Sequence, residues 1–241
     1  MIRLHPVPRP AELTDDKVKE LTECYQREQK SVWNEKFIKD ALLKLSHGKC
    51  CYCECDVSSG GSYLEVEHFH PKSLYPEEVM CWENLLPACK RCNSHKSDHD
   101  TKQEPIIHPV QNAPQDHLSL KNYRLYGKTP LGDKTIERLD LNDRSRLVEK
   151  RFEIGDRLLT TLENLWCDLP TLAEKHIGRK RKQLVDLMLE GTACYEYSAT
   201  AATVILQDEN YQKAKYWFIQ KNLWNGELVN LENGLLEAIL R

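Results

Sequence analysis

Two pairs of cysteines have the spacing of metal-binding turns. Each pair follows the pattern C-x-x-C, at residues 50–53 and 89–92, and the second pair begins 36 positions after the first one ends. A C-x-x-C turn lets two thiolates face one ion, and two such turns supply the tetrahedral sulfur set that Zn²⁺ prefers. The predicted ligands of a structural zinc ion are Cys50, Cys53, Cys89 and Cys92. Cys51 and Cys55 offer an alternative register, and the alternative to any metal is that these thiols are small buried apolar groups.

The segment between the two cysteine pairs contains an acidic residue directly before a histidine. Glu67 and His68 lie in a stretch, residues 63–69, that alternates as a strand does, and Pro71 ends it. An imidazole with a pKa near neutrality can activate water, while a divalent cation held by a carboxylate can neutralise a phosphate oxygen. These residue types side by side indicate metal-dependent hydrolysis of phosphodiester bonds.

The same segment resembles the HNH, or ββα-metal, nuclease family. Three motifs agree with that family in order and spacing: acid-His-x-x-Pro at 67–71, Asn-Leu at 84–85 and C-x-x-C-Asn at 89–93. The resemblance implies a strand that bears the catalytic base, a second strand that begins near an Asn, and a helix that bears the last metal ligand.

The resemblance also implies a role for each matching residue. His68 matches the general base, which deprotonates the attacking water, and Asn84 matches the residue that holds the loop and orients this base. Glu67 and Asn93 match the two protein ligands of the catalytic ion. A carboxylate and an amide oxygen are hard ligands, so Mg²⁺ or Mn²⁺ is the expected catalytic ion.

Basic side chains and two further histidines surround these motifs. The side chains predicted to contact nucleic-acid phosphates are Lys72, Lys90, Arg91 and Lys96. His70 is a candidate accessory residue that contacts a phosphate or assists the metal, or else it is a partly exposed loop histidine. His95 is a second accessory candidate, because a helix would bring it next to His99 four residues later; its alternative is a solvated helix face.

A wider resemblance connects this core to residues further along the chain. Residues 135–142 (TIERLDLN) and 147–151 (LVEKR), together with residues 66–72, are similar to the PtuB-type HNH proteins of Septu and some retron anti-phage systems. The resemblance implies a DNA endonuclease effector in a hetero-oligomeric complex. Its implied partners are a PtuA-like ATPase that gates the activity and, in some systems, a retron reverse transcriptase with its nucleic acid. Two alternatives stay open: the same nuclease acting on RNA such as tRNA, and a non-catalytic zinc-knuckle adaptor that binds nucleic acid.

Composition limits the class of protein. The chain has 241 residues, 40% of them hydrophobic, and a net charge of −3, which excludes a uniformly basic, histone-like binder but allows a local basic site. The first residues lack the apolar run of a signal peptide, and no stretch approaches the roughly twenty apolar residues of a membrane span. We therefore expect a cytoplasmic protein, in which the ten cysteines do not form disulfides.

The expected fold is of the α+β class and mostly α-helical, with a ββα-metal HNH core flanked by N- and C-terminal helices. We predict an N-terminal helical segment (1–46), a nuclease module with the zinc knuckles (47–100), a connecting segment (101–142) and a C-terminal helical region for partner docking (143–241). Apolar residues at three- and four-residue intervals predict the helices. The finer predictions are helices within 11–47 and at about 142–168, 170–190, 195–206, 208–223 and after 225, a turn at 58–61 and a short strand around 123–126.

Overall fold

The computed structural model describes residues 1–58 and 63–241, which form two compact units. The turn predicted at 58–61 therefore lies almost entirely outside the described residues. The first unit consists mainly of residues 3–117 and 127–141, and the second mainly of residues 118–126 and 142–241. The N-terminal helices, the cysteine-rich module and most of the connecting segment thus belong to the first unit, and the C-terminal helices belong to the second.

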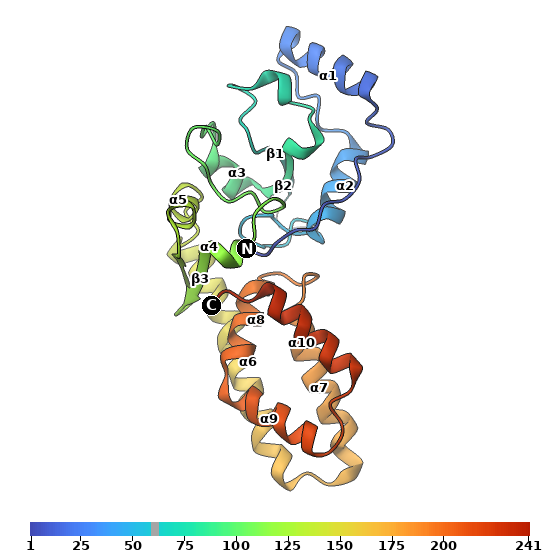
Figure 1. The fold of residues 1–241 in the computed structure, drawn as a ribbon, viewed down its shortest axis with the longest axis vertical. Helices are drawn as coiled ribbons and strands as arrows, with labels where there is room; N and C mark the ends of the chain where they lie inside the picture. The colour runs from blue at the N-terminus through green and yellow to red at the C-terminus, as the bar shows by residue number, and fades with distance from the viewer. Residues whose placement is uncertain (59–62) are drawn as a thin grey trace. The chain divides into compact units, whose positions relative to one another are not determined.

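In the part that the structure describes, the first unit combines five helices with one two-stranded sheet (Figure 1). Two 3₁₀ turns, Pro76–Glu78 and Trp82–Asn84, lie in the connection between its strands. Its helices and strands, in chain order, are α1 (Asp15–Glu28), α2 (Lys36–Ser46), β1 (Leu64–His68), β2 (Leu85–Cys89), α3 (Lys90–Lys96), α4 (Pro114–His117) and α5 (Pro130–Arg138).

The ends of α1 are set by local chemistry. The Thr14 hydroxyl accepts a hydrogen bond from the backbone N–H of Lys17 at 3.2 Å, which satisfies one of the free donors at the start of the helix. Gln29 ends α1 in the left-handed conformation, with φ of 53°. The loop that follows, residues 30–35, separates α1 from α2, so the region 11–47 contains two helices.

The sheet joins the two cysteine-bearing segments. β1 and β2 pair as antiparallel strands, with Leu64 opposite Cys89 and His68 opposite Leu85. All five residues of β2 are buried, and burial along β1 increases towards His68. Both α2 and α3 contact the sheet, and α3 begins directly after β2. The buried residues of α2 are Ile38, Leu42, Leu45 and Ser46.

The helix α3 is shorter than the sequence predicts. It ends at Lys96, because Ser97 has φ of 51°, outside the helical region. His99 therefore follows the helix instead of continuing it, and its Nε2 lies 2.7 Å from the carbonyl oxygen of Glu104. The predicted helical pairing of His95 with His99 is wrong for this reason.

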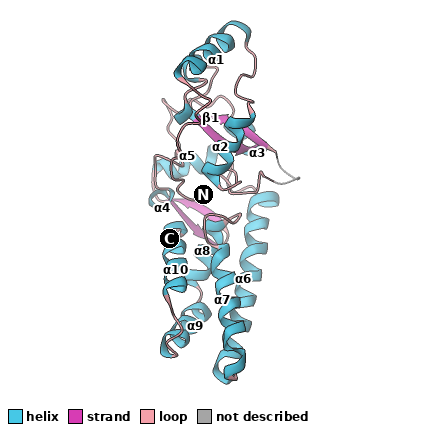
Figure 2. Ribbon diagram, turned by 90° about the vertical axis from the view of Figure 1, so that its right-hand side faces the viewer, coloured by secondary structure: helices cyan, strands magenta, loops and turns pink. Residues whose placement is uncertain are grey.

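The second unit is a bundle of five helices with one short two-stranded sheet (Figure 2). A single π-helical turn, Arg144–Val148, leads into the first of these helices, and two 3₁₀ turns, Leu169–Thr171 and Glu174–His176, precede the second. The helices and strands are β3 (Leu118–Lys121), β4 (Arg124–Gly127), α6 (Glu149–Asp168), α7 (Ile177–Glu190), α8 (Ser198–Gln207), α9 (Glu209–Gln220) and α10 (Gly226–Ala238).

The helix α8 is the centre of this bundle. It contacts α6, α7, α9 and α10, and seven of its ten residues are buried. Its sequence, SATAATVILQ, is built mainly from small and apolar residues, so neighbouring helices can approach on several sides. The predicted mostly helical α+β class is confirmed. No helix among residues 1–58 and 63–241 has the length and apolarity needed to cross a membrane.

The hairpin of β3 and β4 packs closely against α6 at a glycine. Asn122 and Tyr123 form its two-residue turn, both with positive φ, of 48° and 61°. The Tyr123 ring lies against Gly155 of α6, where an added Cβ would stand only 2.3 Å from the Cε1 of this ring. Gly155 is therefore required by close packing.

We predict that Gly155→Ala destabilises the second unit by about 1–3 kcal/mol, because the tyrosine ring must move to make room. Gly178→Ala is the matched control, since nothing lies within 4 Å of an added Cβ at Gly178 of α7. That variant should be neutral or more stable by up to about 1 kcal/mol, because alanine favours the helix. Urea denaturation of the two variants measures the difference, and equal free energies of unfolding would contradict the prediction.

Candidate metal centre and candidate active site

The four cysteines chosen from their spacing come together in the first unit. Their Sγ atoms all lie within 4.8 Å of one another, and all four residues are buried. The Sγ atoms of Cys53 and Cys89 are 3.8 Å apart. The members of this cluster are Cys50, Cys53, Cys89 and Cys92.

Backbone structure positions both cysteine pairs. Cys89 ends β2 and caps α3, where its Sγ accepts a hydrogen bond from the backbone N–H of Cys92 at 3.5 Å. The first pair lies beside β2, because the N–H of Cys51 donates to the carbonyl oxygen of Pro87 at 2.8 Å. Glu54 closes that turn in the left-handed conformation, and its N–H donates to Cys50.

This cluster fits a zinc ion. Four thiolates at a Zn–S distance of about 2.3 Å around a tetrahedral ion lie about 3.8 Å apart, close to the Cys53–Cys89 separation. The cluster contains neither Cys51 nor Cys55, so the geometry favours the register chosen from the C-x-x-C spacing. The four cysteines can therefore bind a metal such as zinc.

A pocket of about 310 Å³ lies next to this centre, at the end of β1. It contains three of the four residues that match the HNH motifs, and Asp98, Ser97 and Ser73 complete its polar rim. The lining residues are Glu67, His68, Pro71, Lys72, Ser73, Asn93, Ser97 and Asp98.

Glu67 is a buried carboxylate that is paired with a buried lysine. The Nζ of Lys96 lies 2.6 Å from its Oε1 and also donates to the carbonyl oxygen of His68 at 2.8 Å. Glu67 and Lys96 are 2% and 1% exposed. Burial raises the pKa of Glu67 to about 7, against the lowering effect of Lys96 and Lys72. The carboxyl group therefore changes its charge close to neutral pH.

His68 is held by one hydrogen bond and one ring contact. Its Nε2 lies 3.0 Å from the carbonyl oxygen of Val79, which selects the tautomer with hydrogen on Nε2 and leaves Nδ1 as a proton acceptor. The Trp33 ring packs against the imidazole at 4.6 Å between centroids. Burial and the neighbouring Lys72 lower the pKa of His68 to about 3, so the ring is neutral at physiological pH.

The Asn84 side chain forms hydrogen bonds with the loop that follows β1. Its Oδ1 accepts a hydrogen bond from the N–H of His70 at 2.6 Å, and its Nδ2 donates to the carbonyl oxygens of His70 and Glu78. Val79, whose carbonyl oxygen holds His68, directly follows Glu78. Asn84 therefore positions the loop that contacts His68, and it does not line the pocket itself.

Asn93 is oriented by a second glutamate. Its Nδ2 donates to the Oε2 of Glu65 at 2.6 Å, so the amide nitrogen is engaged and the amide oxygen stays an acceptor. Glu65 and Glu67 lie two residues apart on β1 and so point to the same face. Asn93 and Glu67 thus line one pocket from α3 and β1.

The basic residues predicted to contact phosphates divide into two pairs. Arg91 donates to the carbonyl oxygens of Leu139 and Asp140 and to the Asp140 carboxylate, at 3.1, 2.7 and 2.7 Å. Lys96 is committed to Glu67, whereas Lys90 is exposed on α3 and Lys72 lines the pocket. The phosphate-contact prediction therefore depends on Lys72 and Lys90.

The two accessory histidines lie outside the pocket lining. His70 has its Nδ1 2.7 Å from the hydroxyl of Thr101, and burial lowers its pKa. His95 is exposed on α3. Neither side chain lies among the residues that form the pocket.

Sequence reasoning missed several residues around the pocket. Trp33 comes from the loop between α1 and α2, and no motif marks it. Glu65 could have been found from its position two residues before Glu67 on the same strand face. The Val79 carbonyl oxygen and Asp98 carry no signal in the sequence, because only the folded chain brings them to this place.

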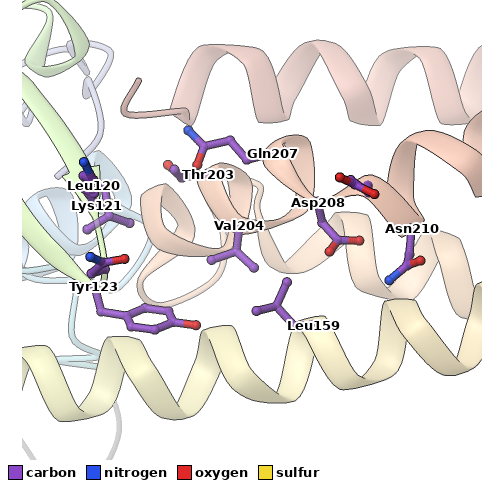
Figure 3. Close-up of a pocket in the computed structure, with 11 residues that line it drawn as sticks. Leu120, Lys121, Tyr123, Leu159, Thr203, Val204, Gln207, Asp208 and Asn210 are labelled. Carbon is purple, nitrogen blue, oxygen red and sulfur yellow. The ribbon is translucent and has the colours of Figure 1, made fainter.

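A larger cavity, of about 550 Å³, lies in the second unit. It is lined by the β3–β4 turn, by Leu159 of α6 and by the corner between α8 and α9 (Figure 3). Figure 3 shows the Tyr123 ring of the turn below Val204, with Leu159 and Asp208 further along the cavity. None of the predicted site residues lines it.

Comparison with known proteins gives two relatives. A Septu protein PtuB from Bacillus thuringiensis is 39% identical over 246 residues, which cover 98% of this chain and 95% of the relative. The chain belongs to the Septu PtuB family. A second Septu protein PtuB, from Bacillus mycoides strain KBAB4, is 28% identical over 156 residues, 51% of this chain and 52% of the relative. No protein-family profile and no solved structure matches the chain of this PtuB-family member.

We predict that the purified protein contains about one equivalent of zinc and that Cys92→Ser loses most of it, because one of four thiolates is removed. Cys167→Ser is the matched control, since Cys167 is exposed and lies outside the cluster. Mass spectrometry of the metal content measures both variants. Less than about half an equivalent in the folded wild-type protein would rule out the zinc site.

Proposed function

We propose that the chain is a metal-dependent HNH endonuclease that hydrolyses phosphodiester bonds, with DNA as the first expected substrate. The observation that carries this proposal is the pocket in which His68, Glu67 and Asn93 meet beside the cysteine cluster. The HNH resemblance assigns roles to the same three residues. Their placement in one pocket, from β1 and α3, supports these roles.

The proposed base is His68. Its Nε2–H donates to the Val79 carbonyl oxygen, so Nδ1 is the atom that accepts a proton from the attacking water. The neutral imidazole that burial enforces is the form that can accept this proton. Lys72 lines the same pocket and attracts the phosphate that undergoes attack.

The proposed ligands of the catalytic ion are Glu67 and Asn93. A Mg²⁺ or Mn²⁺ ion bound there would neutralise charge on the phosphate and the leaving oxygen. Lys96 approaches Oε1 of Glu67, so Oε2 is the oxygen left for an ion, while Glu65 holds the Asn93 amide nitrogen and leaves its oxygen as the ligand. Hydrolysis would leave 5′-phosphate and 3′-hydroxyl ends.

The proposed biological role is that of an effector in anti-phage defence. Two Septu proteins named PtuB are similar to this chain, one over almost its whole length. By the PtuB resemblance, a PtuA-like ATPase holds and gates the nuclease, and the helical second unit is the proposed docking region. A retron reverse transcriptase and its nucleic acid are further proposed partners in systems of that type.

We predict that His68→Ala lowers the cleavage rate by about a hundredfold to ten-thousandfold, because the base is lost. The assay uses plasmid, single-stranded DNA and tRNA with Mg²⁺ or Mn²⁺, with and without the ATPase partner. Cleavage of tRNA alone would select the RNA alternative, and binding without cleavage would select the adaptor.

The matched control for this test is His176→Ala, because His176 is exposed in the 3₁₀ turn before α7. This variant should cleave at the wild-type rate. If His68→Ala, folded and loaded with zinc, also cleaves at the wild-type rate, the assignment of His68 as the base is wrong.

We also predict that Mn²⁺ binding at the pocket weakens as the pH falls below about 7. The pKa of Glu67 is raised to about 7, so at lower pH its carboxyl group is protonated and the ion must displace the proton. The apparent affinity should fall by roughly fivefold between pH 7 and pH 6, because half of the Glu67 carboxyl groups are already protonated at pH 7. Isothermal titration calorimetry measures it, with Glu67→Gln as the control that should bind weakly at both pH values; equal wild-type affinity at both would contradict the prediction.

A further inference from the structure

Trp33 lies beside the pocket although it comes from outside the β1–β2–α3 core. It belongs to the loop between α1 and α2, about thirty-five residues before the motif that contains His68. Its neighbour Val32 is buried, and the Tyr25 ring of α1 packs edge-on against the Trp33 ring at 5.7 Å between centroids. The N-terminal helix α1 therefore contacts the indole ring through Tyr25.

The indole ring touches two polar groups that line the pocket. The ring of His68 packs against it at 4.6 Å, with an angle of 82° between the ring planes. The Nζ of Lys72 lies 5.0 Å from the indole centroid, within the range of a cation–π contact. One half-buried side chain thus contacts both the candidate base and the phosphate-attracting lysine.

The hydrogen bond of His68 does not by itself fix the imidazole. A single bond from Nε2 to the Val79 carbonyl oxygen lets the ring rock about the line of that bond, and this motion moves Nδ1. An aromatic ring packed edge-on against the imidazole at 4.6 Å restricts this motion. The position of a general base matters, because a displacement of about 1 Å can cost about a hundredfold in rate.

We propose that Trp33 is a positioning residue of the nuclease site, which holds the His68 imidazole and the Lys72 ammonium in the pocket. This proposal rests on the proposed nuclease function. It connects the loop between α1 and α2 to the active site, since Trp33 contacts His68 and Lys72 of the pocket lining from behind. Trp33 acts through His68 and Lys72 and takes no part in the bond changes.

The first test is kinetic and uses the full chain, with its ATPase partner if activity requires it, on a DNA substrate that the wild type cleaves. Trp33→Ala should lower kcat by about ten- to a hundredfold and raise KM, because His68 moves and Lys72 loses its support. Trp33→Phe keeps an aromatic surface and should recover kcat to within a few-fold of the wild type. If Trp33→Ala, with its full zinc content and an unchanged melting temperature, has a kcat within twofold of the wild type, the proposal is overturned.

A matched control comes from the second unit. Trp224 is also half-buried, packs against Tyr211 at 6.5 Å and has the Nζ of Lys215 at 5.4 Å from its ring. At a saturating concentration of the ATPase partner, where a weakened contact with the second unit is compensated, Trp224→Ala should leave kcat and KM unchanged. An equal loss of kcat in Trp224→Ala and Trp33→Ala would mean that any lost indole impairs the protein, and would overturn the positioning role.

The second test does not depend on cleavage. NMR spectra of protein labelled with ¹⁵N-histidine report the tautomer and ring-proton shifts of His68, assigned by their loss in His68→Ala. The wild type and Trp33→Phe should show one Nε2–H tautomer with ring protons shifted by the aromatic neighbour, and Trp33→Ala should lose that shift and mix tautomers. Unchanged His68 signals in Trp33→Ala would overturn the proposal. A wild type that cleaves no substrate would overturn the proposed function instead, and the spectra would still show whether Trp33 positions His68.

Discussion

The convergence of two C-x-x-C turns at the junction of β2 and α3 is the constraint on which the first unit depends. Cys89 is at once the last residue of β2, the cap of α3 and a member of the cysteine cluster. A metal at this cluster would fix where α3 starts and in which direction it runs. Asn93 and Lys96, about one and two turns further along α3, reach β1 because of that direction. The positions of Asn93 and Lys96 at the pocket therefore depend on the junction that carries the cysteine cluster.

The buried pair of Glu67 and Lys96 shows the energetic conflict inside this pocket. Burying either charge alone would cost several kcal/mol, so each group requires the other. The pairing does not return Glu67 to an ordinary pKa, because burial outweighs the attraction of Lys96. A carboxylate in that state gains from a second positive charge. Lys96 thus stabilises Glu67 inside the fold, and the raised pKa of the carboxyl group is what the proposed role as a cation ligand would draw on.

The sequence predicted those features that depend on spacing within one segment. The cysteine cluster, the mostly helical α+β class and several helix ends follow from local patterns, because a C-x-x-C turn or an apolar stripe requires nothing distant. The environments of Lys96, Arg91 and Trp33 depend on contacts between segments 28 to about 50 residues apart, and residue type alone did not reveal them. A lysine near a nuclease motif suggests a phosphate contact, but only the fold shows that Lys96 points inward. The early end of α3 depends on one residue with a positive φ, Ser97, which is not a type that predicts this conformation.

The net charge of −3 includes Arg91 and Lys96, which bond to groups of the protein and so are not available to phosphates. Affinity for a nucleic-acid backbone grows with the number of phosphates that free lysines and arginines neutralise. Four basic residues surround the motif, and two of them, Arg91 and Lys96, bond to backbone carbonyls or carboxylates. In the described contacts, Lys72 and Lys90 make no such bond. Arg91 instead donates hydrogen bonds to residues 139–140, which lie in the chain just before the second unit begins. The same helix that contributes Asn93 to the pocket thus also anchors the chain where it leaves the first unit.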